Sequence, residues 1–197
     1  MNITINPNEL LAVALMTAKN DLRAYLNGVN VEVNDKNALI VASNGHNLAA
    51  LALGECDCEN ISFIIPLDLI KNIKKSTKTD VKLVFLSFDP ETKIINLKQS
   101  DQTFMAQALN GDYPNWKRVI PAPFAPGFNF YQMHLMAVFE KAGKLLSSKP
   151  VFYQNGEDQV AGVVQITLSD DRVYMGLIMP FKPGIDKEAM FTPAYTD

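Results

Sequence analysis

Few side chains in this sequence have the types and spacing that catalysis or metal binding requires. His46 stands in a polar turn and has no serine or cysteine nucleophile placed to work with it. Cys56 and Cys58 are separated by one residue, which is poor spacing for a disulfide, and a metal ion would need further ligands. Two reduced cysteines in a loop are therefore expected.

The acidic pairs give no catalytic signal either. Glu157-Asp158 and Asp170-Asp171 fall in predicted turns, where acidic residues are common. The chain contains no glycine-rich phosphate loop and no nucleophile motif. We therefore expect a protein that is not an enzyme, with no cofactor and no metal.

Composition and charge narrow the class further. Apolar residues make up 48% of the 197 residues and charged residues 20%, as in an ordinary globular protein. No apolar run approaches the ~20 residues of a membrane helix, and the N-terminus lacks signal-peptide features, so a cytoplasmic protein is expected. The net charge of −3 argues against a tight grip on phosphates but leaves room for loose DNA contact by a local basic face.

The clearest structural signal is a three-strand meander between Arg23 and Leu53. Valines alternate with polar residues over 29–33, which predicts a half-buried strand. Two nearly all-apolar strands follow, at 38–42 and 48–53. The turn between them, Ser43 to Asn47, contains Gly45, the natural residue for a positive φ.

The order strand, helix, three strands occurs three times along the chain, with weak sequence identity between the copies. The first copy has a strand at 2–6, a helix started by Pro7 and Asn8, and the meander. The second has a strand at 61–65, a helix from Pro66, and strands at 81–88, 93–99 and 103–109. The third has a strand at 127–130, a helix over 131–146, and strands at 150–154, 161–168 and 173–181. This pattern predicts an α+β fold with helices packed on antiparallel sheets. Residues 110–126 contain four prolines and read as a stiff linker, with Trp116 as its anchor on the first domain.

Lysines form the most regular charge pattern. Lys71, Lys74, Lys75 and Lys78 are spaced i, i+3, i+4 and i+7, which would give one basic face on a helix. A solvated surface is the ordinary interpretation of such a face. The alternative is a sequence-independent attraction to phosphates.

Three separated motifs carry a resemblance to a known family. Residues 25–28 (YLNG) with 41–49 (VASNGHNLA), residues 111–121 (GDYPNWKRVIP) and residues 177–182 (LIMPFK) are similar, in the same order, to segments of the bacterial DNA polymerase III beta subunit, the sliding clamp. The chain resembles the clamp's middle domain joined to the second half of its last domain. Asn47 and Lys182 stand where the family has arginine.

The resemblance implies the DNA-clamp (processivity) fold in about three units, or one and a half clamp domains. The expected division is a complete domain over 1–121, a half domain over 127–183 and a tail over 184–197. In the family, a groove between the middle and last domains captures short apolar peptides. The positions that match its lining are Leu26, Ser43, Gly45, His46, Asn47, Leu48, Pro121, Leu177, Ile178, Met179, Pro180 and Phe181.

The resemblance to the sliding clamp also implies a function and partners. The protein would be a processivity factor that encircles double-stranded DNA as an oligomeric ring and tethers a DNA polymerase, a clamp loader or other proteins with a clamp-binding motif. The residues expected to face DNA are Lys71, Lys74, Lys75, Lys78, Lys141 and Lys144, with Lys19 and Arg23. Family rings contain twelve units, so three units per chain predict a homotetramer (3 × 4 = 12) with head-to-tail contacts. The alternative is a clamp mimic that sequesters clamp-binding peptides, or joins a full-length clamp, without encircling DNA.

Overall fold

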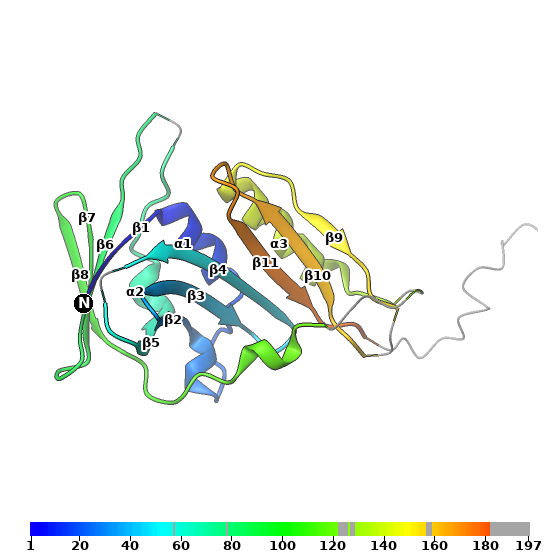
Figure 1. Ribbon diagram of the computed structural model, residues 1–197, viewed down its shortest axis with the longest axis horizontal. Coiled ribbons are helices and arrows are strands. Elements are labelled where there is room, and N and C mark those ends of the chain that lie inside the picture. The colour runs from blue at the N-terminus through cyan, green and yellow to red at the C-terminus, as the bar shows by residue number, and fades with distance from the viewer. Residues whose placement is uncertain (57, 78, 122–125, 127–128, 157–158, 182–197) are drawn as a thin grey trace, which may run out of the picture.

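The computed structural model describes residues 1–56, 58–77, 79–121, 126, 129–156 and 159–181 (Figure 1). The strands are β1 (Asn2–Ile5), β2 (Gly28–Asn34), β3 (Asn37–Ser43), β4 (Asn47–Glu55), β5 (Ile61–Pro66), β6 (Val84–Asp89), β7 (Ile94–Gln99), β8 (Gln102–Gln107), β9 (Val151–Tyr153), β10 (Gly162–Thr167) and β11 (Val173–Ile178). The helices are α1 (Pro7–Ala14), α2 (Leu67–Ile70) and α3 (Met133–Leu146), with 3-10 turns η1 (Ala24–Asn27) and η2 (Trp116–Val119). Among the described residues, no helix is long and apolar enough to cross a membrane.

The strands form two antiparallel sheets. One has the order β1-β6-β7-β8, and the other has the order β5-β2-β3-β4-β11-β10-β9. The α+β expectation is confirmed. The larger sheet is continuous because β4 and β11 pair directly, with Ala49 opposite Gly176.

The three repeats are visible as units. Unit 1 is β1, α1 and β2–β4; unit 2 is β5, α2 and β6–β8; unit 3 is the segment around Phe130, α3 and β9–β11. Units 1 and 2 exchange their leading strands, since β1 pairs with β6 and β5 pairs with β2. This exchange places the leading strand of each unit in the sheet of the other unit.

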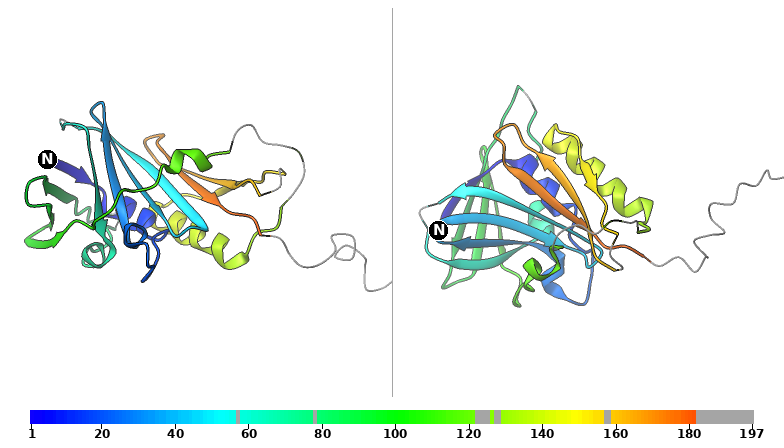
Figure 2. Two further views of the ribbon diagram at one scale, coloured as in Figure 1. Left: turned by 90° about the horizontal axis from the view of Figure 1, so that it is seen from below. Right: turned by 45° about the vertical axis from the view of Figure 1, so that its right-hand side comes forward.

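Helices α1 and α3 lie side by side on one face of the larger sheet, and η2 lies on the opposite face (Figure 2). The main core fills the space between helices and sheet, where Leu10 and Val13 of α1 and Leu135 and Phe139 of α3 are buried. Phe139 packs against Gly176, where a Cβ would collide with its ring. A smaller cluster on the other face includes Trp116 and Leu177.

The first predicted helix is shorter than expected. Its N-cap is Asn6, whose Oδ1 accepts from the amide of Asn8 at 3.0 Å, so Asn8 lies inside the first turn of the helix. The helix ends at Ala14 and the chain then turns toward η1, where Ala18 donates to the carbonyl of Leu26. Lys19 and Arg23 are therefore not on a helix.

The prediction of a second helix from Pro66 through the lysines is largely wrong. Helix α2 has four residues, and the described residues from Asn72 to Leu83 contain neither helix nor strand. The side chain of Gln99 explains this locally: it accepts from the amide of Lys74 and donates to its carbonyl, at 2.9 and 2.8 Å. These bonds replace helical ones, so the predicted basic helix face does not exist. Lys78 lies outside the described residues.

Candidate functional site

The turn from Ser43 to Asn47 holds itself in shape through its own polar groups. Asn44 Oδ1 accepts from the amides of His46 and Asn47, at 2.9 and 2.8 Å. Ser43 Oγ accepts from the Gly45 amide and donates to the carbonyl of Asn47. Gly45 has a φ of +88°, as its position predicted. The conformation of the turn is therefore supported by hydrogen bonds within the turn itself.

The junction of units 1 and 3 lies beside this turn. Asn47 pairs with Ile178 at the end of the β4–β11 ladder, and the amide of Met179 then donates to the carbonyl of His46 at 2.8 Å. Asn47 is 1% exposed, and its Nδ2 donates to the carbonyl of Leu135 in α3 at 3.0 Å. The 43–47 turn of unit 1 is thereby bonded to the end of β11 and to α3 of unit 3.

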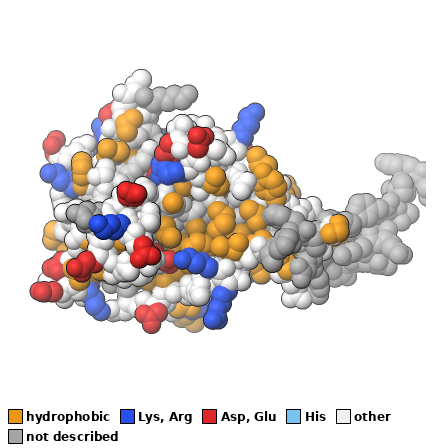
Figure 3. Space-filling model, viewed as in Figure 1, with side chains coloured by type: hydrophobic (Ala, Val, Ile, Leu, Met, Phe, Trp, Pro, Cys, Tyr) orange, Lys and Arg blue, Asp and Glu red, His pale blue; other side chains and the backbone are white. Residues whose placement is uncertain are grey.

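A mainly apolar cavity of about 200 Å³ opens at this junction. Its lining residues are Ser43, Gly45, His46, Asn47, Leu48, Tyr113, Pro114, Trp116, Val119, Leu177 and Met179. It lies on the face of the larger sheet that carries η2, where Figure 3 shows apolar side chains gathered over β4, β11 and β10. Met179 and Val119 are 37% and 47% exposed, so apolar surface is available at the rim.

The proline-rich segment supplies the wall that sequence reasoning missed. Trp116 is buried, and its Nε1 donates to Glu32 Oε1 on β2 at 3.0 Å, which fixes η2 against the sheet. Tyr113 packs edge-on against Tyr25 at 6.4 Å, and burial raises the pKa of Tyr113. The sequence did contain a signal for this wall, because aromatic side chains in a polar, proline-rich stretch are expected to pack against another part of the protein.

Seven of the twelve positions expected in the groove line this cavity: Ser43, Gly45, His46, Asn47, Leu48, Leu177 and Met179. The other five do not line it: Leu26, Pro121, Ile178, Pro180 and Phe181. Leu26 and Ile178 are buried, at 3% and 0% exposure, and cannot contact a ligand directly. Phe181 instead bridges to Phe130 through its backbone.

Two hollows on the helix-covered face of the larger sheet are lined by several of the predicted basic residues, although these residues do not share one helix face. One, of about 300 Å³, is lined in part by Lys19, Lys71 and Lys141, and the other, of about 440 Å³, by Lys75, Lys141 and Lys144. Lys141 belongs to both. We call Lys19, Lys71, Lys75, Lys141 and Lys144 the lysine cluster.

Carboxylates neutralise part of this charge. Lys71 pairs with Asp68 at 2.7 Å and Lys144 with Glu140 at 3.0 Å. Arg23 lies beside Gly45 on the groove side and pairs with Asp21 at 2.9 Å, so it is not part of the lysine cluster. The hydrogen bonds from Arg23 lower the pKa of Asp21 to about 2.

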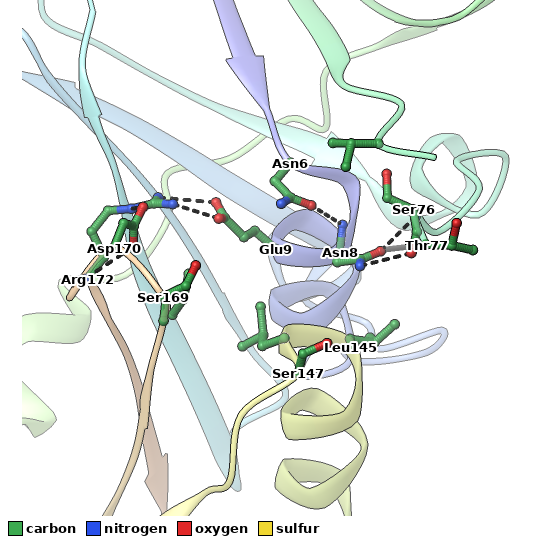
Figure 4. Close-up of a pocket in the computed structure, with 13 residues that line it drawn as sticks. Asn6, Asn8, Glu9, Ser76, Thr77, Leu145, Ser147, Ser169, Asp170 and Arg172 are labelled. Atoms are coloured by element: carbon green, nitrogen blue, oxygen red, sulfur yellow. Dashed lines mark hydrogen bonds and ion pairs between the residues drawn. The ribbon is translucent and has the colours of Figure 1, made fainter. Parts of the chain in front are cut away.

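A further hollow, of about 400 Å³, is lined mostly by polar groups that already bond to one another (Figure 4). Arg172 makes a two-pronged contact with Glu9, at 2.6 and 3.2 Å, and Asn8 Nδ2 donates to the carbonyl of Ser76. These bonds join the β10–β11 turn and the chain after α2 to α1. The hollow is better explained as a structural junction than as a ligand site.

Among the described residues, no group of three or more histidine, cysteine, aspartate or glutamate side chains could hold a metal ion. Both cysteines are present as thiols. The described geometry offers an apolar groove on one face of the larger sheet and a group of lysine side chains on the other.

Residues 7–115 match the model of the central domain of the DNA polymerase III beta subunit. The chain belongs to this family. Over 103 residues it is 31% identical to the beta sliding clamp of Buchnera aphidicola subsp. Rhopalosiphum padi, covering 52% of this chain and 28% of that protein. The chain thus matches less than a third of the length of this clamp relative.

Solved beta clamps share the fold beyond the matched domain. The DNA polymerase III subunit beta of Pseudomonas aeruginosa superimposes with a TM-score of 0.68 at 16% identity, over 93% of this chain and 67% of that chain. The Helicobacter pylori beta clamp bound to a DNA ligase peptide gives a TM-score of 0.67 at 12% identity, over 92% of this chain and 66% of the other. The clamp resemblance identified from the motifs is confirmed, and the chain spans about two thirds of the length of these two solved clamps.

Proposed function

We propose that this clamp-family protein is a processivity factor whose groove captures short apolar peptides of replication proteins. The observation that carries the proposal is the cavity at the β4–β11 junction. It unites the 43–48 turn with Leu177 and Met179, two motifs more than a hundred residues apart. The Helicobacter pylori clamp, which shares the fold, was solved with a DNA ligase peptide, and this supports peptide capture as the role of the groove.

The cavity suits an apolar anchor of a peptide. A volume of about 200 Å³ accommodates one or two side chains, and Tyr113, Trp116 and Leu177 supply apolar walls. Met179 at the rim has a flexible thioether that adapts to different ligands. The edge offers polar atoms of the 43–47 turn, and a peptide held there would gain both burial and directed hydrogen bonds.

Tethering would raise the local concentration of the bound partner. A polymerase held on a ring rebinds the DNA end locally and does not need repeated capture from solution. We propose that the lysine cluster faces double-stranded DNA and gives weak, exchangeable phosphate contacts, which mobility along the duplex requires. The protein would act in the cytoplasm as a binding protein, with polymerase, clamp loader or other motif-bearing proteins as partners.

The ring would need several copies of the chain. With three units per chain and the twelve units expected for a ring, four chains are required. Residues 1–121 would act as a complete clamp domain and the region from 127 to 183 as half of one.

A clamp mimic remains the second candidate, and one observation favours it. Carboxylates neutralise two of the five residues in the lysine cluster, which lowers the positive charge available for contact with DNA. Such a protein would keep the groove and bind clamp-binding peptides without enclosing DNA.

DNA retention separates the two candidates. We expect the protein to stay on nicked circular DNA and to be lost when the circle is linearised, because only an enclosing ring slides off free ends. Calorimetry with a clamp-motif peptide supplies the second measurement. Peptide binding without topology-dependent retention would establish the mimic, and absence of peptide binding would overturn both.

A further inference from the structure

The last strands of units 1 and 3 join these two units. Strand β4 ends unit 1 and β11 ends unit 3, and the two pair antiparallel in the larger sheet. Strand β8 ends unit 2 and lies at the end of the molecule opposite to unit 3 (Figure 1). Within the part of the chain that the structure describes, its one strand neighbour is β7. Two of the three last strands therefore pair with each other, and the third has an open edge.

The backbone groups that face this open edge can be assigned from the hydrogen bonds beside it. Just past β8, the amide of Ala108 donates to the carbonyl of Lys93 at 2.9 Å. In an antiparallel pair, hydrogen-bonded positions alternate along each strand, so every second residue counted back from Ala108 bonds to β7. The remaining residues turn their amides and carbonyls to the open edge, and they are Thr103, Met105 and Gln107.

Strand β8 has none of the features that usually protect an edge strand. Residues 102–107 contain no charged residue and no proline, and their register with β7 has no bulge. Met105 is 66% exposed on the face of the smaller sheet away from the core. On the other face, Phe104 and Ala106 are partly buried against the main core. The edge therefore offers apolar contact on both sides of the sheet, together with backbone groups that can pair with an added strand.

We infer that two copies of this chain pair β8 with β8, antiparallel, about a two-fold axis at Met105. The three outward-facing residues then form hydrogen-bonded pairs, with Met105 opposite Met105 and Thr103 opposite Gln107 of the other copy. On the core side, Phe104 lies opposite Ala106, which places a large side chain against a small one. The contact joins the two smaller sheets into one, as β4 and β11 join units 1 and 3.

A second copy fits this edge better than an unrelated protein. The β4–β11 junction shows that last strands pair with last strands in this fold, and β8 is the last strand left open in each copy. A strand without charges also pairs with itself without placing like charges opposite each other. The inference concerns assembly, and it requires neither that the groove bind a peptide nor that the chain enclose DNA.

The symmetry of this contact has a consequence for any ring. A two-fold contact at β8 cannot repeat head to tail, because it joins the same surface of both copies. A ring of four chains would therefore consist of two such dimers joined by a second kind of contact. This arrangement replaces the head-to-tail contacts expected from the unit count.

Mass in solution tests the inference. By sedimentation or light scattering, we expect the full chain to form an even-numbered assembly. The variant Met105→Lys places two ammonium groups opposite each other on the axis and should have half the wild-type mass. The matched control Phe85→Lys adds the same charge on the same face of the smaller sheet, on β6, where the side chain is 54% exposed and away from the edge. It should keep the wild-type mass, and circular dichroism with a thermal melt checks that both variants fold.

Amide hydrogen exchange followed by NMR locates the contact. The amides of Thr103, Met105 and Gln107 should exchange slowly in the wild-type assembly and fast in the Met105→Lys variant. The amides of Phe104 and Ala106 should exchange slowly in both proteins, because they bond to β7 within one chain. This alternation along one strand is specific to pairing at the edge of β8.

Several outcomes would overturn the inference. A monomeric or odd-numbered wild-type protein would do so, as would an unchanged mass in Met105→Lys or equal exchange at the outward-facing amides in both proteins. An equal loss of mass in Phe85→Lys would show that the outer faces of the sheets stack and that the edges do not pair. Peptide affinity of Met105→Lys should be unchanged, because the groove lies within one chain, so failure of assembly and failure of peptide capture are distinguishable.

Discussion

The amide of Met179 donates to the carbonyl of His46 at 2.8 Å, so the last residues of unit 3 are bonded directly to the turn of unit 1. The bond continues the register of Asn47 with Ile178. The 43–47 turn and the end of β11 therefore meet at one continuous sheet, and η2 of the same chain supplies the remaining wall of the groove. Peptide binding and assembly can be tested independently for this reason.

Met179 should be a binding residue and not a stability residue. We expect Met179→Ala to weaken binding of a clamp-motif peptide by about 1–2 kcal/mol, because the apolar contact that this side chain offers at the rim of the groove is lost. Calorimetry measures this. Met105→Ala on β8, where the side chain is 66% exposed and outside the cavity, is the matched control. Equal affinities of the two variants would show that the peptide docks elsewhere.

Leu26 should show the opposite behaviour. Its side chain is 3% exposed and does not line the cavity, so Leu26→Ala should lower the free energy of unfolding by roughly 2–5 kcal/mol. Affinity of the folded variant for the peptide should be unchanged. Chemical denaturation gives the first value and calorimetry the second. If the Leu26→Ala variant kept its stability and lost affinity for the peptide, Leu26 would be shown to contact the peptide after all.

The sequence predicted most of what local patterns control. The strand over Val29 to Val33, the turn at Gly45 and the apolar strands on either side of it are controlled by neighbours along the chain, and the structure has all of them. The strand is not half-buried as predicted, since Asn30 on its polar face is 0% exposed. The groove motifs at 43–48 and 177–179 were found through their resemblance, because no local pattern says that β4 and β11 pair.

What could not be predicted depends on distant groups. The lysines after α2 have helical spacing, but the side chain of Gln99, 25 residues away, takes the backbone groups of Lys74. Trp116 anchors the linker as expected, through a bond to Glu32, 84 residues earlier, but its place in the wall of the groove was not predicted. Side chains that bond across such separations leave no periodic signal.

Lys141 should dominate contact with DNA. It lines both hollows of the lysine cluster, so Lys141→Glu should lower DNA retention and flatten its dependence on salt concentration, as loss of a phosphate contact does. Lys117→Glu is the matched control, because Lys117 lies over the Trp116 ring on the opposite face. Retention assays over a salt series measure both. An equal effect of the two variants would indicate a general charge effect.

Arg172 should hold unit 3 to unit 1. Its guanidinium contacts Glu9, whose side chain is 7% exposed, and the carbonyl of Ala52 at 2.8 Å. Arg172→Met should cost about 1.5–3 kcal/mol of unfolding free energy, because Glu9 is left charged without its partner. Glu9→Gln combined with Arg172→Met should cost less than Arg172→Met alone. A double variant as unstable as the sum of the single variants would mean that the pair is not coupled.

Arg172→Met should also raise the pKa of one carboxyl group, that of Asp170. A hydrogen bond from Arg172 holds the pKa of Asp170 below its ordinary value of 3.8. A lowered folded-state pKa means that the contact stabilises the protein above pH 3.8 and is lost as pH falls through the lowered value. In Arg172→Met, the carboxyl of Asp170 should titrate closer to 3.8, as NMR of the side-chain carbons would report. The internal control is Asp89, whose pKa is lowered chiefly by the Thr92 hydroxyl and should stay where it is. An unshifted Asp170, or an equal shift at Asp89, would contradict the assignment of this effect to Arg172.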